Sequence, residues 1–96
     1  MIAMTKAEAH ACRATINRLT TLVDSARDLR GEAKTLGLRD TARSLADAAR
    51  TLDGARTRLV EDGAEYLDAA RAFINAAENM LTDRAIYIGR FANGRR

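Results

Sequence analysis

Small and apolar residues recur along the first third of the chain in alternating steps of three and four. The series consists of Ala9, Cys12, Ile16, Leu19, Val23, Ala26 and Ala33. This spacing is typical of a helix that packs along one seam against another helix. Thr5 and Glu8 form a capping-box pattern at its start, and Gly37 stands where a glycine commonly follows a helix end. The pattern predicts a first helix over about residues 5–36.

Beyond Gly37, large apolar residues recur at every seventh position without interruption. They are Leu45, Leu52, Leu59, Tyr66, Phe73 and Met80, with Ala42, Ala49, Ala70 and Ala77 at the companion positions. Such a seam predicts one long second helix over about residues 40–81. The dipeptides Asp53-Gly54 and Asp62-Gly63 are turn signals within it. We therefore expect a helix that is continuous or bent near residue 54 or 63.

The apolar face of this second helix widens after Leu59. A second line with the same spacing lies beside the first and consists of Val60, Leu67, Ile74 and Leu81. A helix with so broad an apolar face is covered on more than one side. The first helix is too short to cover it all, so either the C-terminal segment or a second copy of the chain must do so. These four residues are the candidate helix-docking or dimer face.

The remaining residues complete the expected fold. A short third helix is predicted over about 83–92, followed by a basic tail over 93–96. The chain has 20 alanines and no proline, which favours helix throughout. The sequence thus predicts a single all-α domain over residues 1–96. We expect a long antiparallel helical hairpin with a short C-terminal helix, forming either a small helical bundle or a dimeric four-helix bundle.

Charge adds two candidate surfaces. The net charge is +3, and 14 of the 16 bases are arginine, which suits phosphate binding unless it reflects composition alone. Residues 61–83 carry a net charge of −5, and residues 84–96 carry +4. The candidate partner-binding acidic face consists of Glu61, Asp62, Glu65 and Asp68. The candidate nucleic-acid-binding residues, which combine arginines with aromatic rings, are Arg84, Tyr87, Arg90, Phe91, Arg95 and Arg96.

A further group of bases surrounds the predicted turn. It consists of Arg27, Arg30, Lys34, Arg39 and Arg43. Acidic residues are interleaved with these bases along the chain, namely Asp24, Asp28, Glu32, Asp40 and Asp47. The linear sequence therefore indicates a mixed surface here and no candidate site.

The residues of catalytic chemistry are sparse. His10 and Cys12 are two positions apart, so on a helix they point to different sides and cannot share a metal ion. Glycine-rich phosphate loops and nucleophile-elbow patterns are missing from the sequence. We expect no catalytic, metal or cofactor site and no enzymatic activity. Without a signal peptide or a long apolar run, we also expect a cytoplasmic protein with no membrane partner.

The stretch from Leu29 to Leu52, which reads as helix, Gly-Leu and helix in an Ala- and Arg-rich chain, resembles small helical phage-encoded inhibitors of the anti-CRISPR kind. That resemblance implies stoichiometric blocking of a nucleic-acid-handling complex or of its nucleic acid, without catalysis. The expected partners are accordingly a protein or nucleoprotein complex, or nucleic acid through the basic tail. One alternative is a structural or adaptor hairpin that docks a partner helix or forms a homodimer. Another is a direct nucleic-acid-binding protein.

Overall fold

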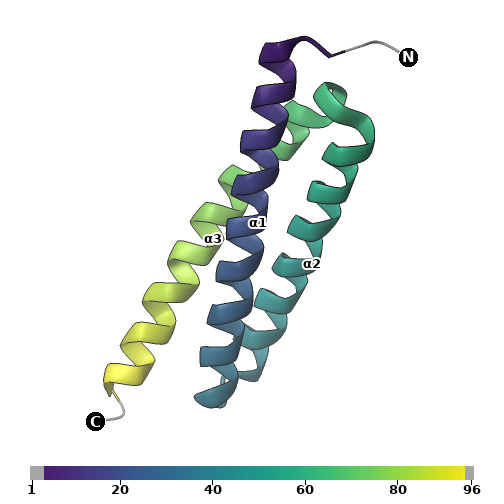
Figure 1. Ribbon diagram of the computed structural model, residues 1–96. Coiled ribbons are helices and arrows are strands. Elements are labelled where there is room, and N and C mark those ends of the chain that lie inside the picture. Colours follow the sequence, from purple (N-terminus) through teal and green to yellow (C-terminus); the bar gives the residue numbers. More distant parts are fainter. Residues whose placement is uncertain (1–3, 95–96) are drawn as a thin grey trace.

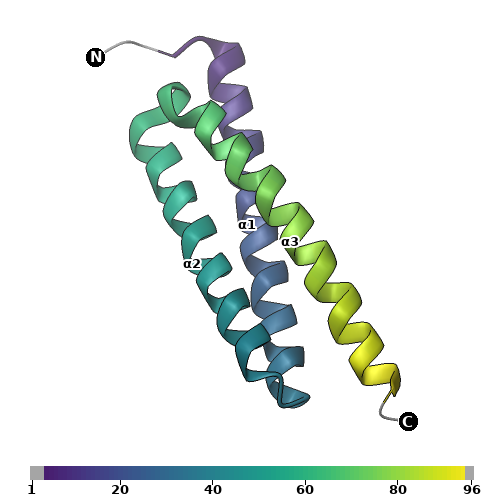
Figure 2. The same cartoon turned by 180° about the vertical axis from the view of Figure 1, so that it is seen from behind.

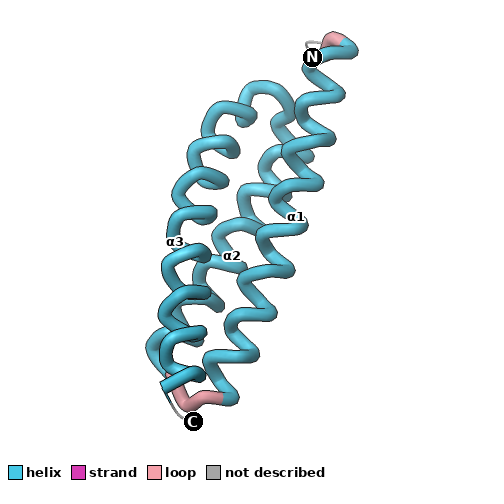
Figure 3. The backbone as a smooth tube through the Cα atoms, turned by 90° about the vertical axis from the view of Figure 1, so that its left-hand side faces the viewer, coloured by secondary structure: helices cyan, strands magenta, loops and turns pink. Residues whose placement is uncertain are grey.

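The computed structural model describes residues 4–94, which form helices and no strand, as the sequence predicted (Figures 1 and 3). Helix α1 covers Lys6–Thr35, and helix α2 covers Arg39–Asp62. A short 3-10 turn, η1, covers Gly63–Tyr66, and helix α3 covers Leu67–Gly94.

Both ends of α1 have the capping contacts that the sequence indicates. The Thr5 hydroxyl accepts a hydrogen bond from the Glu8 backbone N–H at 3.1 Å, and the Glu8 carboxylate accepts one from the Thr5 N–H at 3.0 Å. At the other end Gly37 takes a φ of +76°, a left-handed conformation that glycine adopts without strain. The Leu38 N–H can then reach back to the Ala33 carbonyl at 2.8 Å, which satisfies one of the last carbonyls of α1.

Helix α2 returns alongside α1, and the two helices share the centre of the core. Leu19 of α1 and the leucines 45, 52 and 59 of α2 have 0–1% of their surface exposed. Buried alanines, such as Ala26 and Ala49, alternate with these leucines and let the two helices approach closely. Across the helix pair, the Arg56 guanidinium donates a hydrogen bond to the Thr20 hydroxyl at 3.1 Å.

The second helix of the sequence bends at Asp62-Gly63 and not at Asp53-Gly54. Gly54 lies within α2, whereas Gly63 takes φ +65° and ψ −139° and begins the 3-10 turn. A separate short helix over 83–92 was a wrong expectation. Those residues belong to α3, a helix of 28 residues that starts at Leu67.

Helix α3 folds back and runs in the same direction as α1. Arg18 of α1 forms an ion pair with Glu78 of α3 at 2.5 Å, and farther along, Thr35 of α1 and Ala92 of α3 line the same hollow. Figures 1 and 2 show that α3 starts close to both other helices and diverges from α2 toward its C-terminal end. The Cα atoms fill an elongated volume of 56 × 17 × 15 Å.

The reversal at Gly63 changes which apolar line faces the core. In α2 the line of Leu45, Leu52 and Leu59 is buried, but its continuation in α3 lies at the edge of the core, where Phe73 is 40% exposed and Met80 is partly buried. In α3 the neighbouring line is buried in the core instead: Ile74 is 7% exposed and Leu81 is 5% exposed. A shift of one residue corresponds to a rotation of about 100° on a helix of 3.6 residues per turn.

Candidate anion-binding groove

The candidate nucleic-acid-binding residues of the C-terminal segment lie on the last turns of α3. Tyr87 is 49% exposed and Arg90 is exposed, while Arg84 and Phe91 are half-buried. The Nε atom of Arg84 is buried and has no hydrogen-bond partner among the described residues. The other two candidates, Arg95 and Arg96, lie outside the described residues. Of the four described candidates, Tyr87 and Arg90 are therefore the exposed ones.

The candidate acidic residues form a corner at the end of the molecule where α2 turns into α3. Glu61, Asp62, Glu65 and Asp68 are all exposed there. The Arg58 Nε donates to the Asp62 carboxylate at 2.8 Å, and its guanidinium lies 5.3 Å from the centre of the Tyr66 ring. The hydrogen bond and charge of Asp62 raise the pKa of Arg58 above its usual range. Asp68 has Arg71 at 4.0 Å.

The candidate helix-docking or dimer face is mostly part of the core of the chain itself. Ile74 and Leu81 are buried, and Leu67 is half-buried against the same cluster. Val60 differs, because it precedes the bend and is 66% exposed. Since α3 folds back onto α1, the wide apolar face is covered within the chain, and these four residues do not form one free surface.

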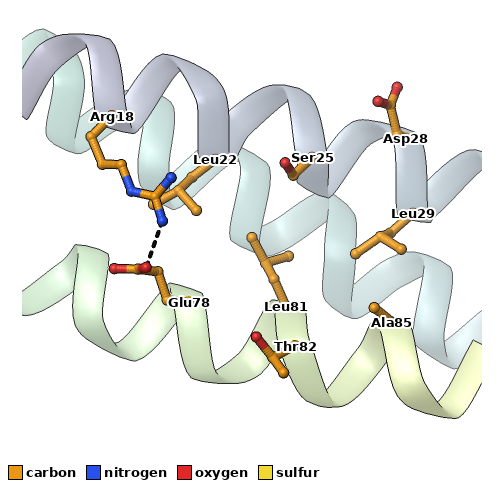
Figure 4. A pocket seen from close by; sticks show the side chains of 9 residues that line it. All are labelled: Arg18, Leu22, Ser25, Asp28, Leu29, Glu78, Leu81, Thr82 and Ala85. Carbon is orange, nitrogen blue, oxygen red and sulfur yellow. Dashed lines mark hydrogen bonds and ion pairs between the residues drawn. The ribbon is translucent and has the colours of Figure 1, made fainter.

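A hollow between α1 and α3 shows how these two helices meet (Figure 4). The ion pair between Arg18 and Glu78 lies at one end, and Leu22, Leu29 and Leu81 point toward the space between the helices (Figure 4). Its only charged groups besides this pair belong to Asp28. The hollow therefore combines leucine side chains with a satisfied ion pair, and no set of side chains there is arranged for acid–base or nucleophilic chemistry.

A basic hollow of about 610 Å³ lies between α1 and α2 near the turn. Four bases line it, two from each helix: Arg30 and Lys34 from α1, and Arg39 and Arg43 from α2. Ala42 and Ala46 complete its lining together with Gly37, and no carboxylate does so. Small side chains between the bases leave room for a group that approaches from solvent.

A second hollow continues the first along the same two helices. The two share Arg30 and Ala46, and the second adds Arg27 from α1 and Arg50 from α2. Its single acid, Asp53, forms an ion pair with Arg56. We call the two hollows together the basic groove, lined by Arg27, Arg30, Lys34, Arg39, Arg43 and Arg50.

The fold separates charges that alternate along the sequence. Asp28 and Glu32 lie between the groove's bases in the chain, yet they line a hollow between α1 and α3, which of the groove's bases only Arg27 also lines. Asp47 pairs with Arg50, and Asp24 and Asp40 do not line the groove. Among residues 4–94 no carboxylate lies within ion-pair distance of the other five groove bases, Arg27, Arg30, Lys34, Arg39 and Arg43.

Sequence analysis named five of the six bases of this groove, without Arg50, and did not recognise a site. The signal that could have identified the site is the position of each base around the helix axis. Arg27, Arg30 and Lys34 follow each other by three and four residues and therefore share one side of α1. Asp28 and Glu32 share another side by the same rule. The net charge of a segment combines both sides of the helix. The angular positions of the residues around the helix axis separate the basic side from the acidic side.

Other kinds of site are not evident in the described part of the chain. Residues 4–94 contain no group of three or more potential ligands that could hold a metal ion. No helix in that range combines the length and apolar character of a bilayer-spanning segment. Comparison of the chain with family models, with curated proteins and with solved structures finds no match.

Proposed function

We propose that this protein binds nucleic acid without catalysis and that the basic groove contacts the phosphate backbone. The observation that supports this proposal is the convergence of six bases from two helices around a floor of alanines. The only acid in the groove, Asp53, is engaged by Arg56. A surface of this composition attracts a polyanion and has few internal charges that must first be displaced.

The dimensions of the groove suit a run of phosphates. Arg39 and Arg50 are eleven residues apart on α2, which corresponds to about 17 Å at about 1.5 Å per residue. One strand of a duplex places a phosphate about every 3.4 Å of helix axis, so this length matches about five phosphates. No aromatic ring lines the hollows described here, so we expect backbone contacts without base stacking and little sequence preference.

Binding of this kind supplies a blocking mechanism. A helical protein seated on the backbone would exclude a larger nucleic-acid-handling complex from the same stretch. This is the stoichiometric inhibition implied by the resemblance to phage-encoded anti-CRISPR inhibitors, here exerted on the nucleic acid. Such a function also agrees with the expected cytoplasmic location.

Salt dependence is the first measurement. Five groove bases lack an ion-pair partner among the described residues. If they neutralise about five phosphates, the slope of log K against log salt is about −4.5, and affinity falls roughly 500-fold between 50 and 200 mM salt. Titration of the protein into labelled single- and double-stranded DNA and RNA by fluorescence anisotropy measures that slope.

A pair of variants with the same change in charge assigns the binding to the groove. We expect Arg30→Gln with Arg43→Gln to weaken binding and to reduce the steepness of the salt slope by about 2. Arg13→Gln with Arg71→Gln removes the same charge outside the groove and should leave the slope nearly unchanged. Equal effects of the two pairs would show that only net charge matters.

The competing proposal is a protein partner that contacts the acidic corner. It is motivated by Glu61 and Glu65, two exposed carboxylates without an ion pair among the described residues. If no nucleic acid binds even at low salt, the groove proposal is wrong. Reversing these two charges and measuring retention of a candidate protein complex is then the next experiment.

A further inference from the structure

Helix α3 carries a second line of large apolar residues beside the line that is buried in the core. Phe73, Met80 and Tyr87 follow each other at intervals of seven, so they lie in one line along the helix. Phe73 is 40% exposed, Tyr87 is 49% exposed, and Met80 is half-buried. Three large side chains in register are more than the scattered exposed apolar residues that a surface usually shows.

The course of α3 bears on the exposure of this line. Figures 1 and 2 both show the C-terminal half of α3 diverging from α2. The hollows between α3 and α1 are lined by other residues of α3, such as Ala85 and Ile88. On this line Phe73 and Tyr87 are exposed, whereas Met80 is partly buried against the core cluster.

Alanines complete a helix-pairing pattern on this side. Ala69 and Ala76 are exposed and alternate with Phe73 and Met80 in steps of four and three, and the next position of the series, before Tyr87, is the exposed Asp83. This is the spacing of core positions in a coiled coil. Large residues on one line and alanines on the next allow a second helix to approach closely. We define Ala69, Phe73, Ala76, Met80 and Tyr87 as the outer seam.

We propose that the outer seam docks the outer seam of a second copy of this chain, with the two α3 helices antiparallel. The charges at the two ends of α3 are the reason for this partner and this direction. Glu65 of η1 and Asp68 lie around its beginning, together with Arg71, and Arg84 and Arg90 lie toward its end, together with Asp83. Antiparallel pairing about Met80 brings the acidic beginning of one copy to the basic end of the other, whereas parallel pairing brings like charges together.

This dimer is independent of the proposed nucleic-acid binding. The basic groove lies between α1 and α2, and no residue of α3 lines it. Antiparallel pairing also makes a self-complementary interface with twofold symmetry, in which the same surface serves both copies. A dimer would therefore carry two separate basic grooves, and loss of pairing would leave each groove intact.

Two neighbouring residues provide a matched test. Ile86 and Tyr87 are both 49% exposed, but they point to different sides of α3 because adjacent helical residues are rotated by about 100°. We expect the wild-type chain to show a concentration-dependent dimer in sedimentation velocity. Tyr87→Glu should raise the dimer dissociation constant at least tenfold, and Ile86→Glu should not change it. Unchanged helicity and melting by circular dichroism show that both variants remain folded.

Mixed variants test the direction of pairing. When Met80 lies at the twofold axis, Phe73 of one copy lies near Tyr87 of the other. Phe73→Glu and Tyr87→Lys should each be monomeric alone and should form a dimer when mixed. A dimer formed instead by Phe73→Glu with Phe73→Lys would overturn the antiparallel arrangement. A wild-type chain that stays monomeric at millimolar concentration, or equal loss of pairing in Ile86→Glu, would overturn the outer seam as the interface.

Discussion

The two Asp-Gly dipeptides of the chain should respond in opposite ways to the same substitution. Gly54 lies within α2, is exposed, and has no atom within 4 Å of the position that an added Cβ would occupy. Gly63 has φ +65° and ψ −139° at the reversal between α2 and α3. We compare Gly54→Ala with Gly63→Ala.

The expected magnitudes follow from these backbone conformations. In a helix interior, replacing glycine by alanine stabilises by roughly 0.5–1 kcal/mol, because the unfolded chain loses conformational freedom. The conformation of Gly63 lies close to a region that is essentially restricted to glycine, where another residue costs about 1–3 kcal/mol. The Cβ at residue 63 would also lie 3.2 Å from the Met4 Sδ atom, a flexible neighbour that can move aside. Backbone strain is therefore the dominant effect there.

Thermal unfolding followed by circular dichroism measures both changes. About 4–8 °C of Tm corresponds to 1 kcal/mol in a domain of this size. We expect Gly54→Ala to raise Tm by roughly 2–8 °C and Gly63→Ala to lower it by at least 4 °C. A synthetic chain with D-alanine at residue 63 is the control, because it adds a methyl group and favours the mirror image of extended backbone. D-Alanine should restore most of the lost stability.

The result that refutes this reasoning is a shift in the same direction for both L-alanine variants. A stabilised Gly63→Ala would mean that residue 63 takes a helical conformation in solution. Helices α2 and α3 would then form one continuous helix, and the burial of Ile74 against α1 would have to be lost.

Two further predictions concern the core and the start of α1. Ile74→Ala should lower the free energy of unfolding by about 2–5 kcal/mol in urea titration, because the side chain is 7% exposed and its removal leaves a cavity. A loss below 1 kcal/mol would show that Ile74 is not a core residue. Thr5→Ala removes the side-chain acceptor of the 3.1 Å capping bond and should cost about 1 kcal/mol in the same assay. The control, Thr57→Ala in the middle of α2, loses only a bond to the Asp53 carbonyl and should have little effect.

Much of the local structure was accessible from the sequence. The capping box of Thr5 and Glu8 and the end of α1 at Gly37 depend on residues within a few positions of each other. Their hydrogen bonds form whenever the local backbone is helical, whatever else the chain does. The seven-residue spacing of Leu45, Leu52 and Leu59 also identifies the buried side of α2, because that helix packs mainly against α1.

The candidate site could be predicted only in part. The sequence gives the identity of the groove bases, and helical spacing places Arg27, Arg30 and Lys34 on one side of α1. It does not say that Arg39 and Arg43 of α2 lie across from them, since that depends on how the two helices are rotated against each other. The acidic corner was easier to predict, because Glu61, Asp62, Glu65 and Asp68 are close in sequence and need no other element to bring them together.

The sequence by itself determined that the chain is helical, where α1 begins and ends, and that residue 54 or 63 is the point where the second helix could bend. Only the tertiary structure decided between these two glycines and between the two apolar lines that follow. Both lines have the same spacing, so periodicity alone does not indicate whether Phe73 or Ile74 is buried in the core. The chain reverses at Gly63, and α3 then packs against α1 with the rotation that buries Ile74 and Leu81. That choice depends on contacts between residues about 60 positions apart, such as Arg18 and Glu78, which no local pattern contains.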